Sequence, residues 1–243
     1  MKKALVIIGL CLLAGYIIFA ALYFEDKPME GLCTGLEVVV DNKGKEQFIS
    51  IAEIEKYITE KGLNPFQKPL TEINTLLIEE AISQNKLIKK AEVFTTNSGS
   101  VKVMITERKP VLRIMTNTGE SYYIDDEGTR MPLSKRYTAY LPIATGAIKE
   151  SFAKGDLYKF ALFLHSDEFW NAQIEQIVVA PNNEVTLIPR VGDQQIVLGY
   201  LDNYQAKLDK LLDFYQRGLN DMGWNKYSVI NLKFDKQVVC TKR

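Results

Sequence analysis

The chain has 243 residues, of which 47% are hydrophobic and 25% are charged, and its 30 basic residues balance its 30 acidic residues. A balanced charge excludes the basic footprint of a nucleic-acid-binding domain, and one histidine with three scattered cysteines excludes a recognisable zinc ligand set. The length suffices for an apolar amino-terminal segment followed by one large or two small domains.

The first predicted element is a transmembrane helix over residues 4–24. This run contains no charged residue and directly follows Lys2 and Lys3. As a helix it would rise about 31 Å, which is enough to cross the hydrocarbon core of a bilayer. Because basic flanks stay in the cytoplasm, we expect residues 1–3 there and the rest of the protein outside. A cleaved signal peptide is the alternative, but the length of the run and its bulky end, residues 22–24, favour a retained anchor.

A short tether and a compact α+β module are expected after the anchor. Residues 25–35 carry one proline and two glycines without an apolar period, which is typical of a tether. Residues 36–107 then predict the order strand, helix, helix, strand, strand. We expect the strands at 36–41, 87–95 and 101–106 and the helices from Ser50 to Gly62 and from Thr71 to about Asn85. Two amphipathic helices on one face of a three-stranded sheet would bury both apolar faces.

The first of these helices has the clearest boundary signals. Ser50 and Glu53 have the spacing of a capping box, and Ile54 and Ile58 follow at helical spacing before Gly62. These local signals predict where the helix begins and ends.

The pattern changes near Pro110, and residues 108–243 predict a second domain, a mixed β-sheet with packed helices. Strands are expected at 111–116, 120–125, 174–180, 184–189, 194–199, 227–234 and 237–241, and helices around 157–164 and over 202–218. Residues 134–149 show no regular pattern and are expected to be irregular.

No group of residues in the sequence predicts catalysis. His165 lies near a helix end without a G-x-S-x-G nucleophile motif elsewhere. The acidic run 125–127 is consecutive, unlike the alternating ligands of a calcium loop, and is interpreted as a solvated hairpin turn. Cys33 and Cys240 are placed too differently to form a disulfide framework and are expected to be free thiols. We therefore expect no enzyme, no cofactor, no metal site and no small-molecule substrate.

The last strand offers a candidate binding surface. Nothing follows residues 237–241 except Lys242 and Arg243, so no later segment can cover the outer edge of this strand. An uncovered edge exposes backbone groups that can accept a partner strand. Lys242 and Arg243 are also residues that blunt such edges, so an ordinary structural strand remains the alternative at this point.

The order of these parts resembles the FtsQ/DivIB family of bacterial division proteins. The resemblance covers essentially the whole chain and is carried by the single span, the strand–helix–helix–strand–strand module, the junction Ile105–Val111, the hairpin Tyr123–Gly128 and the terminal Ile230–Asp235. It implies that residues 36–107 are a POTRA domain and that residues 108–243 are the family's β-domain.

Members of that family have no known catalytic activity. They bind the single-span proteins FtsL and FtsB, and they help place and control the septal cell-wall synthase. The resemblance implies a single-pass protein of the inner membrane, with its outer domains in the periplasm and enriched at the division septum. It also implies that FtsB adds a strand at the carboxyl-terminal edge, where the expected contacts are Lys233, Phe234, Lys236, Gln237, Val238, Val239 and Cys240.

One segment departs from the family pattern. Some relatives use a basic residue before the penultimate hairpin to anchor an acidic residue of FtsB, and residues 198–202 contain none. The contact is then expected from the aromatic Tyr200, or from Lys207 or Lys210 one turn further along.

Two other functions are alternatives to a role in division. A membrane-anchored POTRA-type factor for envelope protein assembly or transport is the main alternative, although such factors usually carry several modules in series. An anchored cell-wall hydrolase is disfavoured because no histidine, cysteine or carboxylate constellation is present.

Overall fold

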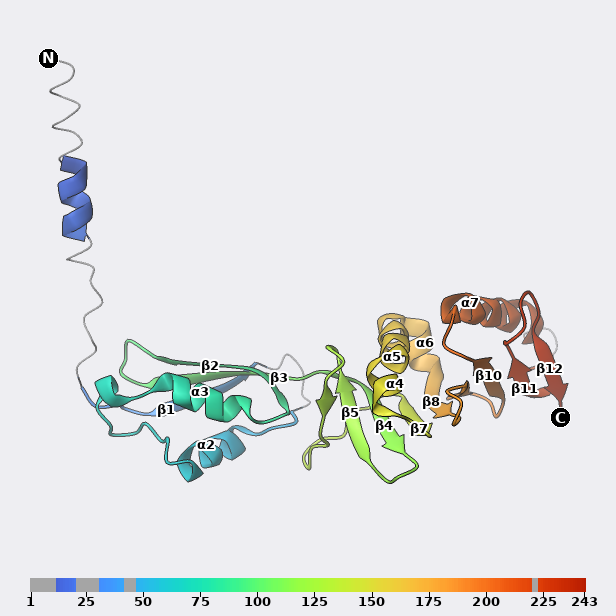
Figure 1. Ribbon diagram of the computed structural model, residues 1–243, viewed down its shortest axis with the longest axis horizontal. Helices are drawn as coiled ribbons and strands as arrows, with labels where there is room; N and C mark the ends of the chain where they lie inside the picture. The colour runs from blue at the N-terminus through green and yellow to red at the C-terminus, as the bar shows by residue number, and fades with distance from the viewer. Residues whose placement is uncertain (1–11, 21–30, 42–46, 220–222) are drawn as a thin grey trace, which may run out of the picture.

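The computed structural model describes residues 12–20, 31–41, 47–219 and 223–243. Within these ranges the chain forms a three-stranded sheet and a nine-stranded sheet, each with helices packed on it (Figure 1). The helices over the three-stranded sheet, α2 (Ile51–Glu60) and α3 (Thr75–Ser83), share one apolar core with it, and a separate core lies under the helices of the nine-stranded sheet. The chain is thus α+β, as predicted.

The amino-terminal helix is only partly described. Residues 12–20 are helical and expose large apolar side chains such as Leu12 and Phe19. In the described part of the chain no helix has the length and hydropathy needed to cross a membrane, so the predicted transmembrane helix is not seen there as a spanning element. The remainder of the predicted span, residues 1–3 and most of the tether lie outside the described residues.

The first sheet follows the predicted order. Its elements are β1 (Leu36–Asp41), α2 (Ile51–Glu60), the 3₁₀ turn η1 (Leu70–Glu72), α3 (Thr75–Ser83), β2 (Ile88–Thr95) and β3 (Val101–Glu107). Strand β3 is central, parallel to β1 and antiparallel to β2. Val101, Val103 and Ile105 are fully buried, which confirms the predicted alternation in β3.

The two helices differ in how well their starts were predicted. The capping box of α2 is present, with the Ser50 hydroxyl accepting from the Glu53 amide at 3.1 Å and the Glu53 carboxylate accepting from the Ser50 amide at 2.8 Å. The predicted start of the second helix at Thr71 is wrong. Asn74 caps α3 by accepting from the Leu77 amide at 3.1 Å, so the chain makes a separate 3₁₀ turn before the helix begins.

The second sheet has the order β12-β11-β10-β9-β8-β7-β4-β5-β6. Its strands are β4 (Pro110–Thr116), β5 (Ser121–Asp125), β6 (Arg130–Met131), β7 (Ile143–Gly146), β8 (Ile174–Val179), β9 (Val185–Pro189), β10 (Gln195–Gly199), β11 (Tyr227–Asn231) and β12 (Val239–Lys242). The prediction that residues 134–149 are irregular is wrong for β7, which pairs in parallel with both β4 and β8.

The helices of the second domain cover one face of this sheet. They are α4 (Glu150–Lys154), α5 (Asp156–Ser166), α6 (Glu168–Gln173) and α7 (Tyr204–Phe214), the last continued by the π-helical turn η2 (Tyr215–Leu219). Figure 1 shows α5 and α6 beside β4, β7 and β8, and α7 beside β10 and β11. Leu157, Phe160 and Leu208 are fully buried in the core cluster that these helices share with the sheet.

An apolar cluster joins the two sheets. Phe48, which precedes α2, packs edge-to-face on Tyr123 of β5 and on Tyr137, with ring centroids 6.2 and 5.2 Å apart. Met131 completes the buried part of this cluster. The Ser134 hydroxyl donates to the backbone carbonyl of Phe48 at 2.6 Å. Residues distant in sequence therefore hold the start of the first module against the second sheet.

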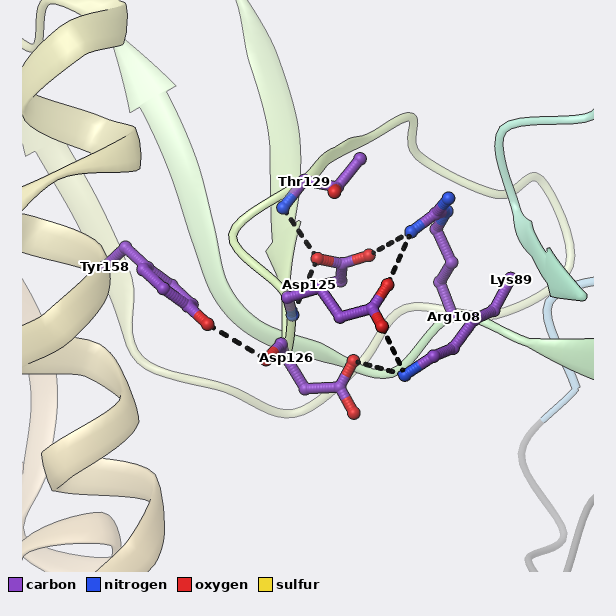
Figure 2. A network of polar contacts seen from close by, with 7 residues as sticks. Lys89, Arg108, Asp125, Asp126, Thr129 and Tyr158 are labelled. Carbon is purple, nitrogen blue, oxygen red and sulfur yellow. Dashed lines mark hydrogen bonds and ion pairs between the residues drawn. The ribbon is translucent and has the colours of Figure 1, made fainter.

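A polar network lies beside this cluster, at the hairpin after β5 (Figure 2). Arg108, in the linker between β3 and β4, donates to the fully buried carboxylate of Asp125 at 2.7 Å. The amides of Glu127 and Thr129 donate to the other oxygen of Asp125 at 3.0 and 2.7 Å. The interpretation of this acidic run as a solvated turn is therefore wrong for Asp125.

The other two carboxylates of the run connect the hairpin to both parts of the chain. Lys89 of β2 forms ion pairs with Asp126 at 3.5 Å and Glu127 at 3.0 Å. These bonds raise the pKa of Lys89, chiefly through its hydrogen bond with Glu127. On the other side, the Tyr158 hydroxyl of α5 donates to the Asp126 carbonyl at 2.9 Å, as Figure 2 shows. The hairpin thus bonds to the first sheet and to a helix of the second domain.

Candidate binding site at the carboxyl-terminal edge

Strand β12 ends the second sheet. It pairs antiparallel with β11, and in the described part of the chain no strand lies on its other side. The strand begins at Val239 and ends at Lys242, so Gln237 and Val238 belong to the segment that leads into it rather than to the strand. The sheet therefore has an edge at the place where the sequence predicts one.

The direction of the backbone groups of β12 follows from two hydrogen bonds. The Arg243 amide donates to the Lys226 carbonyl at 3.3 Å, and the Ser228 hydroxyl donates to the Thr241 carbonyl at 3.3 Å. Residues 241 and 243 therefore face β11. In an antiparallel strand, successive residues direct their N–H and C=O groups to opposite edges. The N–H and C=O of Cys240 consequently face the outer side.

The side chains of β12 divide between the two faces of the sheet. Val239 is 43% exposed, whereas Cys240 and Val238 pack against the apolar core under α7. This burial raises the pKa of the Cys240 thiol. Cys33 and Cys240 both carry free thiols, as expected. The edge thus combines outward backbone groups with an exposed valine.

Phe234 lies in the turn before β12 and is 50% exposed. The predicted strand 227–234 is wrong at its end, because β11 stops at Asn231. The Asn231 side chain accepts from the Lys233 amide at 3.0 Å, which turns the chain out of the strand. Leu232 is still fully buried and its amide donates to the Val197 carbonyl at 2.9 Å. The alternation therefore continues to Leu232 and fails at Phe234.

The predicted basic and aromatic contacts gather around one depression of about 440 Å³ beside this turn. Its lining includes Tyr200, Lys207, Lys210, Lys233 and Lys236. Tyr200 is 52% exposed. The structure therefore brings Tyr200, Lys233 and Lys236 together with both lysines that the sequence offered as alternatives to Tyr200.

Three of the four lysines are engaged within the protein. Lys207 donates to the Tyr200 carbonyl at 2.8 Å and pairs with Asp202, and that hydrogen bond lowers the pKa of the Asp202 carboxyl. Lys233 pairs with Glu184 at 2.6 Å, and the hydrogen bond likewise lowers the pKa of Glu184.

The third engaged lysine, Lys210, donates to two backbone carbonyls of the turn, at 2.6 and 3.2 Å. For Lys236 the structure gives no ion pair with any described residue. Lys236 also adopts a left-handed backbone conformation with φ of 56°, which is uncommon for a residue other than glycine, asparagine or aspartate.

Gly199, at the end of β10, is a site residue that the sequence did not reveal. Its φ is +77°, and a Cβ atom there would lie 2.8 Å from Cγ of Lys233. A larger residue would displace the stem of Lys233 and strain the backbone. The position after a strand is a signal for a turn glycine, but its contact with Lys233 depends on the parallel pairing of β10 with β11.

The structure places no metal centre in the residues it describes. Within residues 12–20, 31–41, 47–219 and 223–243, no three histidine, cysteine, aspartate or glutamate side chains are grouped so that they could hold a metal ion. His165 lies in the last turn of α5, remote in sequence from the edge formed by β12.

Two family models match the chain. One is described as a POTRA-like domain and matches residues 31–106, and the other is described as FtsQ/DivIB, C-terminal related, and matches residues 109–241. Among curated proteins, the cell division protein FtsQ of Rhodothermus marinus is 23% identical over 183 residues. The aligned region covers 70% of this chain and 66% of that relative, which is slightly less than two thirds of the relative's length.

Proposed function

The chain belongs to the FtsQ/DivIB family, and from this membership we propose that it is a bitopic membrane scaffold of the bacterial division machinery. In this proposal residues 36–107 are the POTRA domain and residues 108–243 are the β-domain. Residues 4–24 anchor the protein in the inner membrane, with residues 1–3 in the cytoplasm and both domains in the periplasm. The protein is enriched at the septum and helps recruit and control the septal peptidoglycan synthase without catalysis of its own.

The proposed partners are FtsB-like and FtsL-like single-span division proteins. The observation that carries this proposal is the outer side of β12, which ends the nine-stranded sheet and bears no further strand among the described residues. A partner strand added there would pair with the outward backbone groups of Cys240, and these hydrogen bonds would set the register. Exposed side chains beside the edge, above all Val239 and Phe234, would then select the partner.

The site also supports one ionic contact. Lys207 and Lys233 form ion pairs and Lys210 bonds to two carbonyls, whereas the structure gives Lys236 neither an ion pair nor a side-chain hydrogen bond with a described residue. Lys236 lies in the turn between Phe234 and β12. We assign to Lys236 the role of the basic anchor that residues 198–202 do not provide. Tyr200, which also lines the depression, supplies an exposed aromatic surface.

Replacing Phe234 by alanine should weaken capture of the FtsB-like partner roughly 30-fold, because a central aromatic anchor at an interface is worth about 2 kcal/mol or more. The measurement is co-purification of that partner with the full-length, membrane-inserted chain. Phe169→Ala is the matched control, since Phe169 is a similarly exposed phenylalanine on α6, outside the site. Equal capture by wild type and Phe234→Ala would contradict the site assignment.

Depletion of the protein in growing cells tests the function itself. Cells that elongate or remain joined without completing septa would support a role in division. Normal septa combined with defective assembly of envelope proteins would instead support a POTRA-type assembly or transport factor, which the match to a POTRA-like domain also permits.

A further inference from the structure

Lys210 of α7 reaches across to the turn that carries Phe234. Its ammonium group donates to the backbone carbonyl of Leu232 at 3.2 Å and to that of Phe234 at 2.6 Å. Both carbonyls belong to the segment that leaves β11 and turns toward β12. An ammonium group has three donors, so these two bonds use most of its capacity.

The surroundings of Lys210 strengthen these bonds. The residue is half-buried, and its desolvation lowers the pKa of the ammonium group, while the charge of Asp235 opposes that shift. A cation that has lost part of its water depends on the protein for hydrogen bonds, and bonds with a charged donor are about twice as strong as neutral ones. Removing the donors would therefore leave the two carbonyls without their strongest partner.

The turn has few other constraints near Phe234. Leu232 is fixed by its buried side chain and by its amide bond to Val197, and the Lys233 amide is held by Asn231. The backbone of Phe234 accepts a hydrogen bond from Lys210 at its carbonyl, and the structure gives it no other backbone hydrogen bond within the described residues. The position of the half-exposed Phe234 ring therefore depends on Lys210.

We propose that Lys210 is a positioning residue for partner binding, which holds the turn so that the Phe234 ring is presented beside the edge of β12. This inference rests on the proposed function and deepens it. Lys210 acts through Phe234 rather than through contact with an acidic residue of the partner. Lys207, one turn earlier on α7, bonds to Tyr200 and Asp202 instead of the turn. Lys154 of α4, which pairs with Glu150 outside the site, serves as the matched comparison.

The test begins with Lys210→Met in the full-length chain, assayed by capture of the FtsB-like partner. Methionine keeps the apolar stem but lacks the donors, and capture is expected to weaken about tenfold. Lys154→Met, on α4 outside the site, is expected to stay within about twofold of wild type, because Lys154 pairs with Glu150 of its own helix. Lys210→Arg retains donors and charge and is expected to restore most of the capture. A Lys210→Arg chain as weak as Lys210→Met would overturn the proposal.

A double-mutant cycle separates positioning from direct contact. In a chain that already carries Phe234→Ala, adding Lys210→Met is expected to cause no further loss, since the ring to be positioned is absent. Losses that multiply in the double variant would show that Lys210 contacts the partner by itself and would overturn the proposal.

Hydrogen exchange in the absence of partner gives an independent measurement. Amides from Lys233 to Val238 should exchange faster in Lys210→Met than in wild type, with little change in the thermal midpoint. Unchanged exchange of these amides would contradict the proposal that Lys210 holds the turn. A wild-type chain that captures no partner would contradict the proposed function, whereas wild-type capture matched by Lys210→Met would contradict the present inference alone.

Discussion

Cys240→Pro is expected to abolish detectable capture of the FtsB-like partner, whereas Cys240→Ala should stay within about twofold of wild type. Proline removes the outward N–H of Cys240 and places its ring on the side where a partner strand would lie. The bonds between β11 and β12 should persist, because they involve Val239 and Thr241 rather than Cys240. Loss of a backbone bond combined with steric exclusion should reduce affinity by roughly 100-fold or more.

Two controls make this substitution informative. Cys240→Ala removes the thiol and keeps the amide, so it isolates the backbone from the side chain. Thr241→Pro removes an amide that faces β11, and it should lower the thermal midpoint of the chain, whereas Cys240→Pro should shift it by only a few degrees. Normal capture by a folded Cys240→Pro chain would mean that the partner docks through side chains alone.

Other sheet edges in the described part of the chain are less suited to strand addition. At the outer side of β2, the Val93 amide already donates to the Glu79 carboxylate of α3 at 3.2 Å. At the opposite end of the large sheet, β6 has two residues, one of them Arg130. A short edge strand, or a charged side chain bonded to the edge, discourages pairing with a strand of another chain. The remaining edges are β1 and β12, and of these only β12 lies in the region matched by the FtsQ/DivIB carboxyl-terminal model.

Local patterns predicted those parts of the fold that local chemistry determines. The buried alternation of Val101, Val103 and Ile105 and the capping box at Ser50 were both visible in short windows of sequence. The second helix start failed because two polar residues, Thr71 and Asn74, can each act as a cap, and the tertiary structure selects Asn74.

Strand β7 shows where sequence patterns are uninformative. It has four residues and pairs in parallel with strands on both sides, and only Ala144 is fully buried. Strands inside a parallel arrangement need not alternate, and an alanine between a threonine and an isoleucine carries no strand signal. The strand forms because β4 and β8 supply hydrogen-bond partners from distant parts of the chain.

Some features of the candidate site could likewise be predicted from the sequence, and others could not. The sequence predicted a strand at residues 237–241, and the structure places β12 at an end of the large sheet. Phe234 and Lys236 follow from the family resemblance. The roles of Lys207 and Lys210 could not be separated by sequence, because they lie three residues apart on one helix. Only the tertiary structure shows that Lys207 bonds to Tyr200 and that Lys210 bonds to the turn of Phe234.

Asp125→Ala is expected to lower the free energy of unfolding by about 3 kcal/mol or more. The carboxylate of Asp125 is fully buried, and the side chain of its partner Arg108 is only 19% exposed. Removing one member of a buried pair leaves the other charge without compensation, and here the amides of Glu127 and Thr129 also lose their acceptor. Chemical denaturation of the full-length chain, followed by circular dichroism, measures the loss.

Glu127→Ala provides the matched control in the same hairpin. Its side chain is 50% exposed, and its ion pairs with Lys89 and Arg108 are therefore expected to contribute less than about 1 kcal/mol. If the two substitutions destabilise the chain equally, the buried pair of Arg108 and Asp125 does not hold the hairpin.

Because Arg108 lies between the two sheets, a large loss of stability in Asp125→Ala should also destabilise the first module. Faster hydrogen exchange in β3, whose last residue precedes Arg108, would detect this coupling.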